Sequence, residues 1–289
     1  MPDADRPRYR PEMTQAGLSP CQPAPAMDEL GMMRDTPIAG ERPLTLYLDK
    51  REVVTLMTLG GQPELLAIGY LRNQGLVKQL SDIVAVQADW ETEAVVVVTR
   101  HGVADLDGKL ARRTVTTGCG QGTVFGELMD ELDRIRVPAV VLRQSGIYAL
   151  LRSLTAYNEV YKQAGAVHGC ALCRGDEILM FVEDVGRHNA VDAIAGHMWL
   201  EDIDGSDKVF YTTGRLTSEM VIKVAQMRIP VLLSRSGVTQ MGLDLARRVG
   251  VMMIARAKGS HFLVFNGAER LLLDAIPALR PERAEARLA

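Results

Sequence analysis

The chain has few cysteines, no long apolar segment and little net charge, and each absence excludes a class of protein. Four cysteines in 289 residues cannot form a disulfide framework, so we expect free thiols that serve chemistry, metal binding or packing. No uninterrupted apolar segment approaches the roughly 20 residues that a bilayer requires, and the first residues show no basic-then-apolar export signal. We therefore expect a cytoplasmic protein with no membrane partner.

The charge balance also argues against a nucleic-acid partner. Lysine and arginine number 33 against 36 aspartates and glutamates, which gives a net charge of -3, whereas phosphate contacts along a nucleic acid need concentrated positive charge. Any nucleotide partner is thus expected to be small and locally bound. With 47% hydrophobic residues the chain can bury a full core, as one large domain or two closely packed ones.

The sequence patterns divide the chain into five segments. Residues 1–40 hold seven of the thirteen prolines and little periodic apolar pattern, which predicts a mostly disordered leader that includes Cys21. An N-terminal α+β part follows over 41–118, a flexible loop and connection over 119–143, an α/β/α domain over 144–275 and a C-terminal tail over 276–289. No internal repeat is present.

Apolar periodicity predicts the elements of both folded parts. In the first part, strands near 44–48 and 53–57 form a hairpin that turns at Asp49-Lys50, a helix runs from Pro63 to Gly75, and strands cover 83–86 and 94–99. In the second part, a long helix covers 144–163 and strands alternate with helices, which predicts a sheet with helices on both faces. The expected strands are 167–172, 178–182, 209–212, 231–233, 251–254 and 262–265, and the expected helices are 190–200, 217–228 and 239–249.

The polar string Glu183–Ala190 stands between an apolar run and a helix. The run 178–182 predicts a buried strand, so the string falls at the carboxyl end of a strand, where open α/β sheets bind ligands. Arg187 and His188 follow Gly186 at the start of the helix, where backbone N–H groups and the helix dipole favour a phosphate. An ion pair between Asp184 and Arg187 is the structural alternative.

Two further turns have the same character. Gly214 and Arg215 follow a strand and precede a helix that Thr217 or Ser218 would cap, although Glu219 and Met220 fit equally as ordinary first-turn residues. The basic turn Arg256-Ala257-Lys258-Gly259-Ser260-His261 lies between the last two strands, where it could equally be a solvated hairpin tip. Three such turns at strand ends of one sheet predict a site for an anionic ligand.

Cys119 lies in the loop Thr116–Gly122, which contains three glycines within five residues. Because glycine costs backbone entropy and adds no apolar contact, this density predicts a mobile or tightly turned loop that presents the thiol. A nucleophilic Cys119 needs exposure and nearby positive groups or N–H donors, since a free thiol is only slightly ionised at neutral pH. The alternative is a small hydrophobic residue in a turn.

A second pair of thiols, Cys170 and Cys173, follows His168 at a spacing that suits zinc or a redox couple. On a strand, however, Cys170 and Leu172 would face one side while Cys173 faces the other. Structural zinc also needs four ligands, and only three candidates are local. We expect no metal site and no permanent metal.

With these motifs in place, the chain resembles the FdhD family, the sulfurtransferases that serve formate dehydrogenases, over roughly 41–265. The motifs that carry the resemblance are Glu41–Thr45, Glu64–Leu71, the Thr-Thr-Gly-Cys loop, Glu183–Ala190 and Gly214–Met220. The resemblance implies a three-layer α/β/α sandwich similar to the cytidine deaminase fold, working as a homodimer. The absence of any His-x-Glu sequence and of proline before Cys170-x-x-Cys173 argues against a zinc-dependent deaminase itself.

The resemblance also implies an activity. Cys119 would accept sulfur from a cysteine desulfurase as a persulfide and pass it to the molybdenum bis-molybdopterin guanine dinucleotide (bis-MGD) cofactor that formate dehydrogenase needs. By position, Arg256–His261 would contact this cofactor, although the segment departs from the usual aromatic and arginine-glycine pattern of the family. Arg187, His188, Gly214 and Arg215 are expected to bind the same cofactor from their position at strand ends, through either its guanine or its phosphates.

The chain departs from the family pattern at its thiols. Many members carry a second cysteine three residues after the first, where this chain has Gly122, so Cys119 has no resolving partner in its loop. Cys170 and Cys173 are unusual as well, and one of them could assist Cys119. The altered loop leaves open a chaperone that binds bis-MGD and delivers it to an apoenzyme without moving sulfur.

Overall fold

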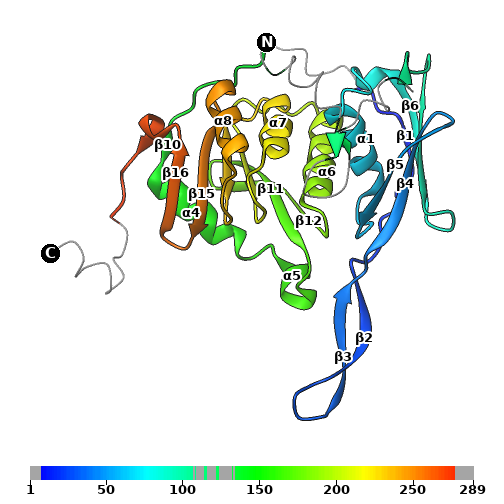
Figure 1. Ribbon diagram of the computed structural model, residues 1–289, viewed down its shortest axis with the longest axis horizontal. Coiled ribbons are helices and arrows are strands. Elements are labelled where there is room, and N and C mark those ends of the chain that lie inside the picture. The colour runs from blue at the N-terminus through cyan, green and yellow to red at the C-terminus, as the bar shows by residue number, and fades with distance from the viewer. Residues whose placement is uncertain are drawn as a thin grey trace.

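The computed structural model describes residues 8–106, 108, 114–115, 122–123, 132 and 134–276, which form a mixed α/β structure with a small and a large sheet (Figure 1). Cys119 lies in the chain between the short antiparallel strands β8 (Thr114–Val115) and β9 (Gly122–Thr123), outside the described residues. The predicted boundary at 118/119 and nearly all of the predicted tail also lie outside them. No helix in the described ranges is long and apolar enough to cross a bilayer.

The N-terminal sheet has the strand order β1-β6-β7-β4-β5. Its elements are β1 (Glu12–Met13), β4 (Arg42–Leu48), β5 (Arg51–Thr58), β6 (Ile83–Asp89) and β7 (Ala94–Thr99), with α1 (Pro63–Asn73) and the 3-10 turn η1 (Leu80–Asp82). The predicted hairpin at Asp49-Lys50 is confirmed, because Leu48 pairs with Arg51. Pro63 starts α1 as expected, since its missing N–H has no partner to lose in a first turn.

The large sheet has the order β12-β11-β13-β14-β15-β16, in which β13, β14 and β15 run parallel and β11 and β16 run against their neighbours. The strands are β11 (His168–Arg174), β12 (Glu177–Asp184), β13 (Val209–Thr212), β14 (Val231–Ser234), β15 (Met252–Lys258) and β16 (His261–Asn266). Each of the six predicted strands is confirmed, with ends that shift by a few residues.

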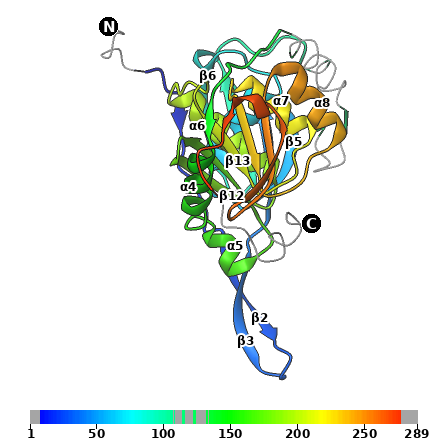
Figure 2. The same ribbon diagram turned by 90° about the vertical axis from the view of Figure 1, so that its left-hand side faces the viewer.

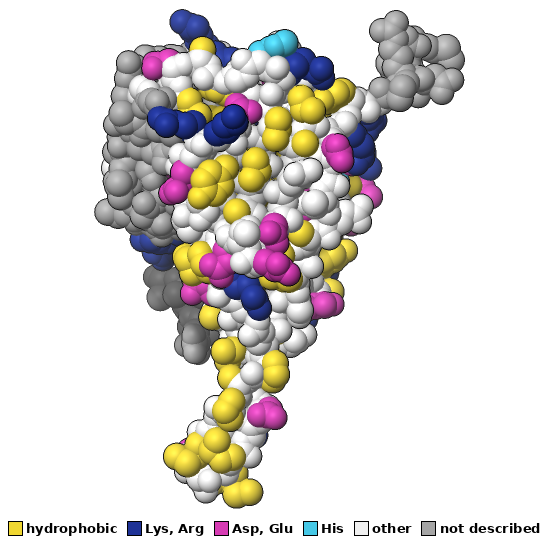
Figure 3. Space-filling view, turned by 90° about the vertical axis from the view of Figure 1, so that its right-hand side faces the viewer, with side chains coloured by type: hydrophobic (Ala, Val, Ile, Leu, Met, Phe, Trp, Pro, Cys, Tyr) yellow, Lys and Arg dark blue, Asp and Glu magenta, His cyan; other side chains and the backbone are white. Residues whose placement is uncertain are grey.

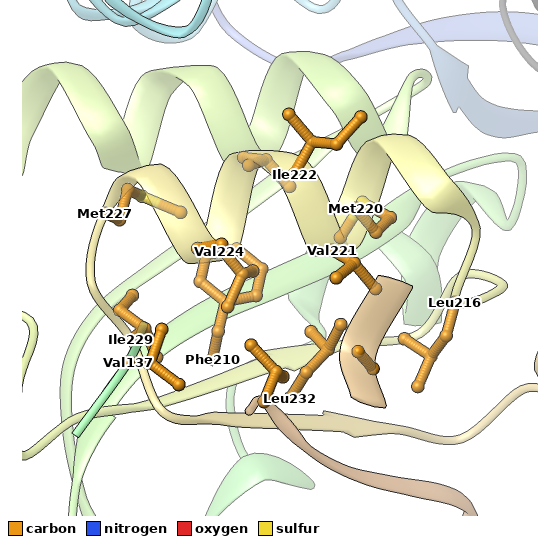
Figure 4. Packing of buried hydrophobic residues seen from close by; sticks show 14 of the residues in the cluster. Val137, Phe210, Leu216, Met220, Val221, Ile222, Val224, Met227, Ile229 and Leu232 are labelled. Atoms are coloured by element: carbon orange, nitrogen blue, oxygen red, sulfur yellow. The ribbon is translucent and has the colours of Figure 1, made fainter. Parts of the chain in front are cut away.

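Helices cover both faces of this sheet, as predicted (Figure 2). One face carries α6 (Arg187–Leu200), α7 (Ser218–Gln226) and α8 (Gln240–Val249), and the other carries α4 (Gln144–Leu154). Figure 4 shows Val221 and Val224 of α7 facing Phe210 and Leu232 of the sheet, all of them fully buried. At the sheet margin, β10 (Leu142–Arg143) pairs with β17 (Leu271–Leu272) after the turn η2 (Ala268–Arg270).

The predicted helix 144–163 is interrupted. Helix α4 ends at Leu154, and α5 (Glu159–Ala164) begins after four residues. The side-chain amide of Asn158 donates 2.8 Å to the Leu154 carbonyl and so replaces the backbone donor that a continuous helix would use.

Helix α6 joins the two parts of the molecule through a close crossing with α1. A Cβ on Gly69 would lie 1.7 Å from the Asp192 carbonyl oxygen, and a Cβ on Gly196 would lie 2.1 Å from that of Leu65. Only glycine at both positions therefore lets the helices approach this closely. Ala193 and Leu200 of α6 belong to the core of the N-terminal part, while the opposite side of α6 belongs to the core under the large sheet.

The leader predicted to be disordered over 1–40 instead contains two seven-residue strands. They are β2 (Cys21–Met27) and β3 (Met33–Ala39), which form an antiparallel hairpin projecting from the body (Figures 1 and 2). The high proline content misled the prediction, because Pro23, Pro25 and Pro37 occupy positions whose nitrogens face away from the partner strand. Proline is tolerated there, since it removes no hydrogen bond within the hairpin.

Candidate functional site

The carboxyl ends of four strands meet at one edge of the large sheet. Strands β12, β13, β14 and β15 all run in the same direction, because β11 is antiparallel to both of its neighbours. The starts of β11 and β16 lie at the same edge. The turns after β12, β13 and β15, which the sequence singled out, therefore lie at one edge of the sheet, as predicted. The turn after β14 lies between the turns after β13 and β15.

Asp184 closes β12 and fixes the entry to α6. Its carboxylate accepts hydrogen bonds from Thr58 Oγ1 (2.5 Å) and the Leu59 amide (3.1 Å), and from the Gly186 amide (2.9 Å) and Asn189 Nδ2 (2.8 Å). Burial raises the pKa of Asp184, and these four hydrogen bonds oppose that rise. None of these four donors belongs to Arg187. The ion pair of Asp184 with Arg187, which was the structural alternative, is therefore not formed.

Arg187 starts α6, and its side chain is 4% exposed. Its Nε and Nη2 have no hydrogen-bond partner among the described residues. The side chain packs against Gly214, where a Cβ would come within 2.5 Å of Arg187 Cδ, so the turn after β13 and the start of α6 are in direct contact. A buried guanidinium without partners is costly, and an anion at this helix start would supply the missing acceptors.

Two histidines flank this arginine. Burial, and secondarily the charges of Lys223 and Arg187, lower the pKa of His188 well below its usual value, so its ring is neutral at pH 7. His188 Nε2 lies 3.2 Å from Glu219 Oε2, but neither ring nitrogen reaches hydrogen-bond geometry. Burial, followed by Arg187 and Arg215, also lowers the pKa of His168.

The turn after β13 is held by hydroxyl groups. The Gly214 amide donates to Thr212 Oγ1 (3.1 Å), and Ser234 Oγ donates to the Gly214 carbonyl (2.6 Å). Thr213 Oγ1 accepts the Gly169 amide (3.0 Å) and lies 3.4 Å from His168 Nδ1. This turn presents the exposed Arg215 beside the two histidines, whose pKa values its charge lowers.

The third turn is a hairpin tip between β15 and β16. Lys258 pairs with His261, Gly259 has φ 61° and Arg256 has φ 52°, while Ala257 is fully buried. The Arg256 amide donates to the Ser236 carbonyl (2.9 Å), which ties the hairpin to the turn after β14. The segment thus lies on the expected edge, two strands from the turn that carries Arg215. Its geometry also agrees with the solvated hairpin tip that the sequence left open.

Cys170 and Cys173 have the character of packing residues. They lie in the cores on opposite faces of the sheet, as the strand alternation predicted. Burial raises the pKa of each thiol to about 12, so neither is a nucleophile at neutral pH. Within the described ranges, no group of three or more histidine, cysteine, aspartate or glutamate side chains could hold a metal ion.

A buried ion pair braces the helix that carries Arg187. Lys223 Nζ of α7 lies 2.7 and 2.8 Å from the carboxylate oxygens of Asp192 on α6, and Asn73 Nδ2 of α1 donates 2.7 Å to the same carboxylate. Sequence analysis missed this link and the contact of Thr58 with Asp184, because each joins residues far apart in the chain. His168 was weighed there only as a zinc ligand beside Cys170 and Cys173, a site that the sequence did not favour, although pairing of its strand with β13 could have placed it at the edge.

A cavity of about 620 Å³ has Asp184 among its lining residues. Residues of both parts of the molecule line it, among them Thr58, Gln62, Tyr157, Phe181 and Asn189. Tyr157 and Phe181 form a tilted aromatic pair with ring centroids 5.5 Å apart. The cavity is in the size range of small-molecule sites and shares Asp184 and Asn189 with the start of α6.

The model of the FdhD/NarQ family matches residues 39–272 of this chain. The sulfur carrier protein FdhD of Listeria monocytogenes is 28% identical over 241 residues, which cover 82% of this chain and 92% of that protein. The protein of the same name from Bacillus subtilis is 28% identical over 233 residues, with 80% and 88% covered.

A crystal structure shows the same fold. It is that of a protein assigned as a formate dehydrogenase accessory protein from Desulfotalea psychrophila. It superposes with a TM-score of 0.69 at 28% identity and covers 87% of this chain and 98% of its own. The strand-edge residues described above fall within the matched range, and the chain belongs to the FdhD/NarQ family.

Proposed function

We propose that this protein is a sulfur carrier that takes sulfur from a cysteine desulfurase and transfers it to bis-MGD for a formate dehydrogenase. The names of its relatives support the sulfur-carrier part, and the structural neighbour supports the link to formate dehydrogenase. The thiol that carries the sulfur is Cys119. The cargo is an anionic dinucleotide, and the protein acts as a homodimer in the cytoplasm.

The single observation that carries the proposal is the guanidinium of Arg187, whose Nε and Nη2 find no hydrogen-bond partner in the part of the chain that the structure describes. It lies buried at the start of a 14-residue helix, beside Arg215 and two histidines whose pKa values are lowered. An oxyanion placed here would accept from Arg187 and from the N–H groups at the start of α6. The diphosphate of the guanine dinucleotide has this chemistry. The adjoining cavity, with Tyr157 on its wall, is the candidate place for the planar base.

Sulfur transfer needs one reactive thiol and no metal of the protein's own. The thiolate of Cys119 attacks the terminal sulfur of the desulfurase persulfide, and the cysteine of the desulfurase leaves as a thiolate. In the second step the S–S bond at Cys119 breaks, Cys119 keeps the electron pair of that bond as a thiolate, and the outer sulfur leaves as sulfane sulfur, for which the acceptor cofactor would supply the electron pair of the new bond. Of the other three cysteines, Cys170 and Cys173 are buried with raised pKa values, and Cys21 lies outside the family match, which leaves Cys119 as the best candidate.

A cofactor chaperone is the second candidate, and Gly122 favours it. The chain has glycine where many relatives have a second loop cysteine, so an internal disulfide cannot release a persulfide at Cys119. A chaperone would bind bis-MGD at the same strand edge and deliver it to the enzyme unchanged.

The variant Cys119→Ala separates the two functions. We expect it to bind bis-MGD as the unmodified chain does, measured by co-purification of the cofactor, and to leave formate dehydrogenase inactive in a cell that has no other copy. The matched control Cys21→Ser removes a partly exposed thiol outside the family match and should retain activation. Full activation by Cys119→Ala would show that the protein is a chaperone instead.

A further inference from the structure

The cavity that Asp184 lines is acidic. Among the described residues of its wall, Glu159, Glu183 and Asp184 carry carboxyl groups, and none is a lysine, arginine or histidine. The start of α6, which meets the cavity at Asn189, instead carries the buried guanidinium of Arg187. Negative phosphates therefore suit the helix start, whereas the cavity suits a neutral group that donates hydrogen bonds.

Aromatic rings and the outermost strand of the large sheet shape this cavity. The tilted pair of Tyr157 and Phe181 lines one part of it, and residues 181–184 of β12 all contribute to the wall. Pro20, directly before β2, also lines it, so the cavity reaches the base of the hairpin that projects from the body in Figure 3. Aromatic side chains stack on planar heterocycles, which favours a base as the occupant.

The carboxylate of Glu183 is held in place by the backbone of α5. Its Oε2 accepts the Val160 amide and its Oε1 accepts the Tyr161 amide, each at 2.9 Å. A carboxylate offers about four lone-pair sites, so each oxygen keeps an acceptor site beyond these two hydrogen bonds. Glu183 therefore lines the cavity with two fixed acceptors that lie side by side.

The other two acids of the wall lack this combination. Asp184 already accepts four hydrogen bonds from the protein, which uses all of its lone-pair sites. The side chain of Glu159 is exposed and forms no hydrogen bond or ion pair with any described residue, so nothing fixes its direction. Of the three acids, Glu183 alone is both fixed and able to accept further hydrogen bonds.

Two adjacent acceptors of a fixed carboxylate select a ligand with two adjacent N–H donors. Guanine presents such a pair, at N1–H and at its 2-amino group. Adenine has an acceptor at N1, which a carboxylate repels, and hypoxanthine has no 2-amino group. Bidentate hydrogen bonds to a carboxylate are stronger than neutral ones and fix the orientation of the ligand, so this pairing discriminates between bases.

We propose that Glu183 selects guanine in this cavity by accepting hydrogen bonds from N1–H and from the 2-amino group. Val160 and Tyr161 act through their amides, which hold the carboxylate in position. The inference rests on the proposed function, which places the planar base of the cargo in this cavity, and it adds the residue that distinguishes one base from another. If Glu183 only capped α5, it would have no effect on which base is bound.

Calorimetric titration of the full chain with GDP and with IDP, which lacks the 2-amino group, tests the proposal. GDP should bind at least about tenfold more tightly than IDP, because IDP leaves one charged acceptor unpaired. Glu183→Gln keeps the size of the side chain but only one acceptor oxygen. We expect it to weaken GDP binding by about 10- to 100-fold and IDP binding by much less, so that the preference for GDP is lost.

Two further variants serve as controls. Glu177→Gln makes the same change on the same strand, where Glu177 pairs with Arg174 at the surface outside the cavity, and it should keep both affinities. Arg187→Met should weaken GDP and IDP by the same factor, because both nucleotides carry the same diphosphate.

The ratio of the two affinities separates the outcomes. An equal loss of GDP and IDP binding in Glu183→Gln would show that Glu183 only supports α5, and would overturn the proposal. Equal affinities of the unmodified chain for GDP and IDP would also overturn it, while the anion site at Arg187 would stand. Binding of neither nucleotide would contradict the proposed cofactor site as a whole, and the base selection with it.

Discussion

A buried guanidinium with unpaired nitrogens lowers the stability of a fold, and Arg187 at the start of α6 has two nitrogens without a hydrogen-bond partner among the described residues. Arg187→Met keeps most of the aliphatic packing against Gly214 and removes the charge. We expect the free energy of unfolding to rise by about 1 kcal/mol or more, as measured in denaturant, because buried charges are often replaced favourably by apolar groups. The same change should weaken the binding of GDP, measured by calorimetry, by about 10- to 100-fold.

Arg174→Met is the matched control, since Arg174 is exposed and, within the described ranges, forms an ion pair only with Glu177 at the surface. Arg174→Met should change neither the free energy of unfolding nor the free energy of GDP binding by more than about 0.5 kcal/mol. Loss of stability in Arg187→Met together with unchanged GDP binding would show that Arg187 is structural.

We predict that His188 makes the free energy of unfolding depend on pH. Its folded-state pKa is lowered by burial, so the unfolded chain binds more protons in the window between that value and about 6.5. Stability from this group is therefore complete above pH 6.5 and is lost as pH falls through the window. Between about pH 7 and pH 5 the free energy of unfolding should fall less in His188→Gln than in the unmodified chain. The difference is expected to reach up to about 1.4 kcal/mol per pH unit.

Thermal or denaturant unfolding of both chains at each pH gives this comparison. The buried carboxyl groups of Asp184 and Asp192 also contribute to the pH dependence, through raised pKa values, but they are present in both chains. The difference between the chains isolates the histidine. Identical pH profiles would mean that folding does not lower the pKa of His188.

At the scale of elements, the crossing of α1 and α6 depends on two glycines. Gly196→Ala places a Cβ 2.1 Å from the Leu65 carbonyl oxygen, so the helices must separate. We expect a loss of about 1–3 kcal/mol in the free energy of unfolding, the usual cost of overpacking. Gly146→Ala is the matched control, because it also lies in a helix and its Cβ would meet no atom within 4 Å. The control should be neutral or stabilising, and an equal loss in both would contradict the crossing.

Elements with a clear period could be predicted from the sequence. Strand β13 matches its predicted bounds because its apolar run ends at a polar turn, and α1 follows from Pro63 and its apolar stripe. The hairpin β2–β3 was missed because composition alone cannot tell which way a proline nitrogen points. The isolation of Arg187 could not be foreseen either, since it arises when Thr58 and Leu59, more than a hundred residues away, satisfy Asp184.

At the scale of the whole molecule, α6 takes part in both large cores, and Lys223, Asp192 and Asn73 link three helices across them. We therefore expect one cooperative unfolding transition. The fluorescence of Trp90 and Trp199 reports on the N-terminal core, against which both side chains pack, whereas far-UV circular dichroism reports on the helices of the whole chain. Coincident midpoints are the expected result. An earlier fluorescence transition would show that the N-terminal part unfolds separately.

The central claim is that Cys119 carries sulfur, and intact-mass spectrometry tests it most directly. The full chain is incubated with a cysteine desulfurase and cysteine, and the adduct is then located by peptide mapping. The account predicts a gain of one sulfur atom that reductant removes, located on Cys119, retained in Cys21→Ser and lost in Cys119→Ser. An unmodified chain, or sulfur confined to Cys170 or Cys173, would contradict it.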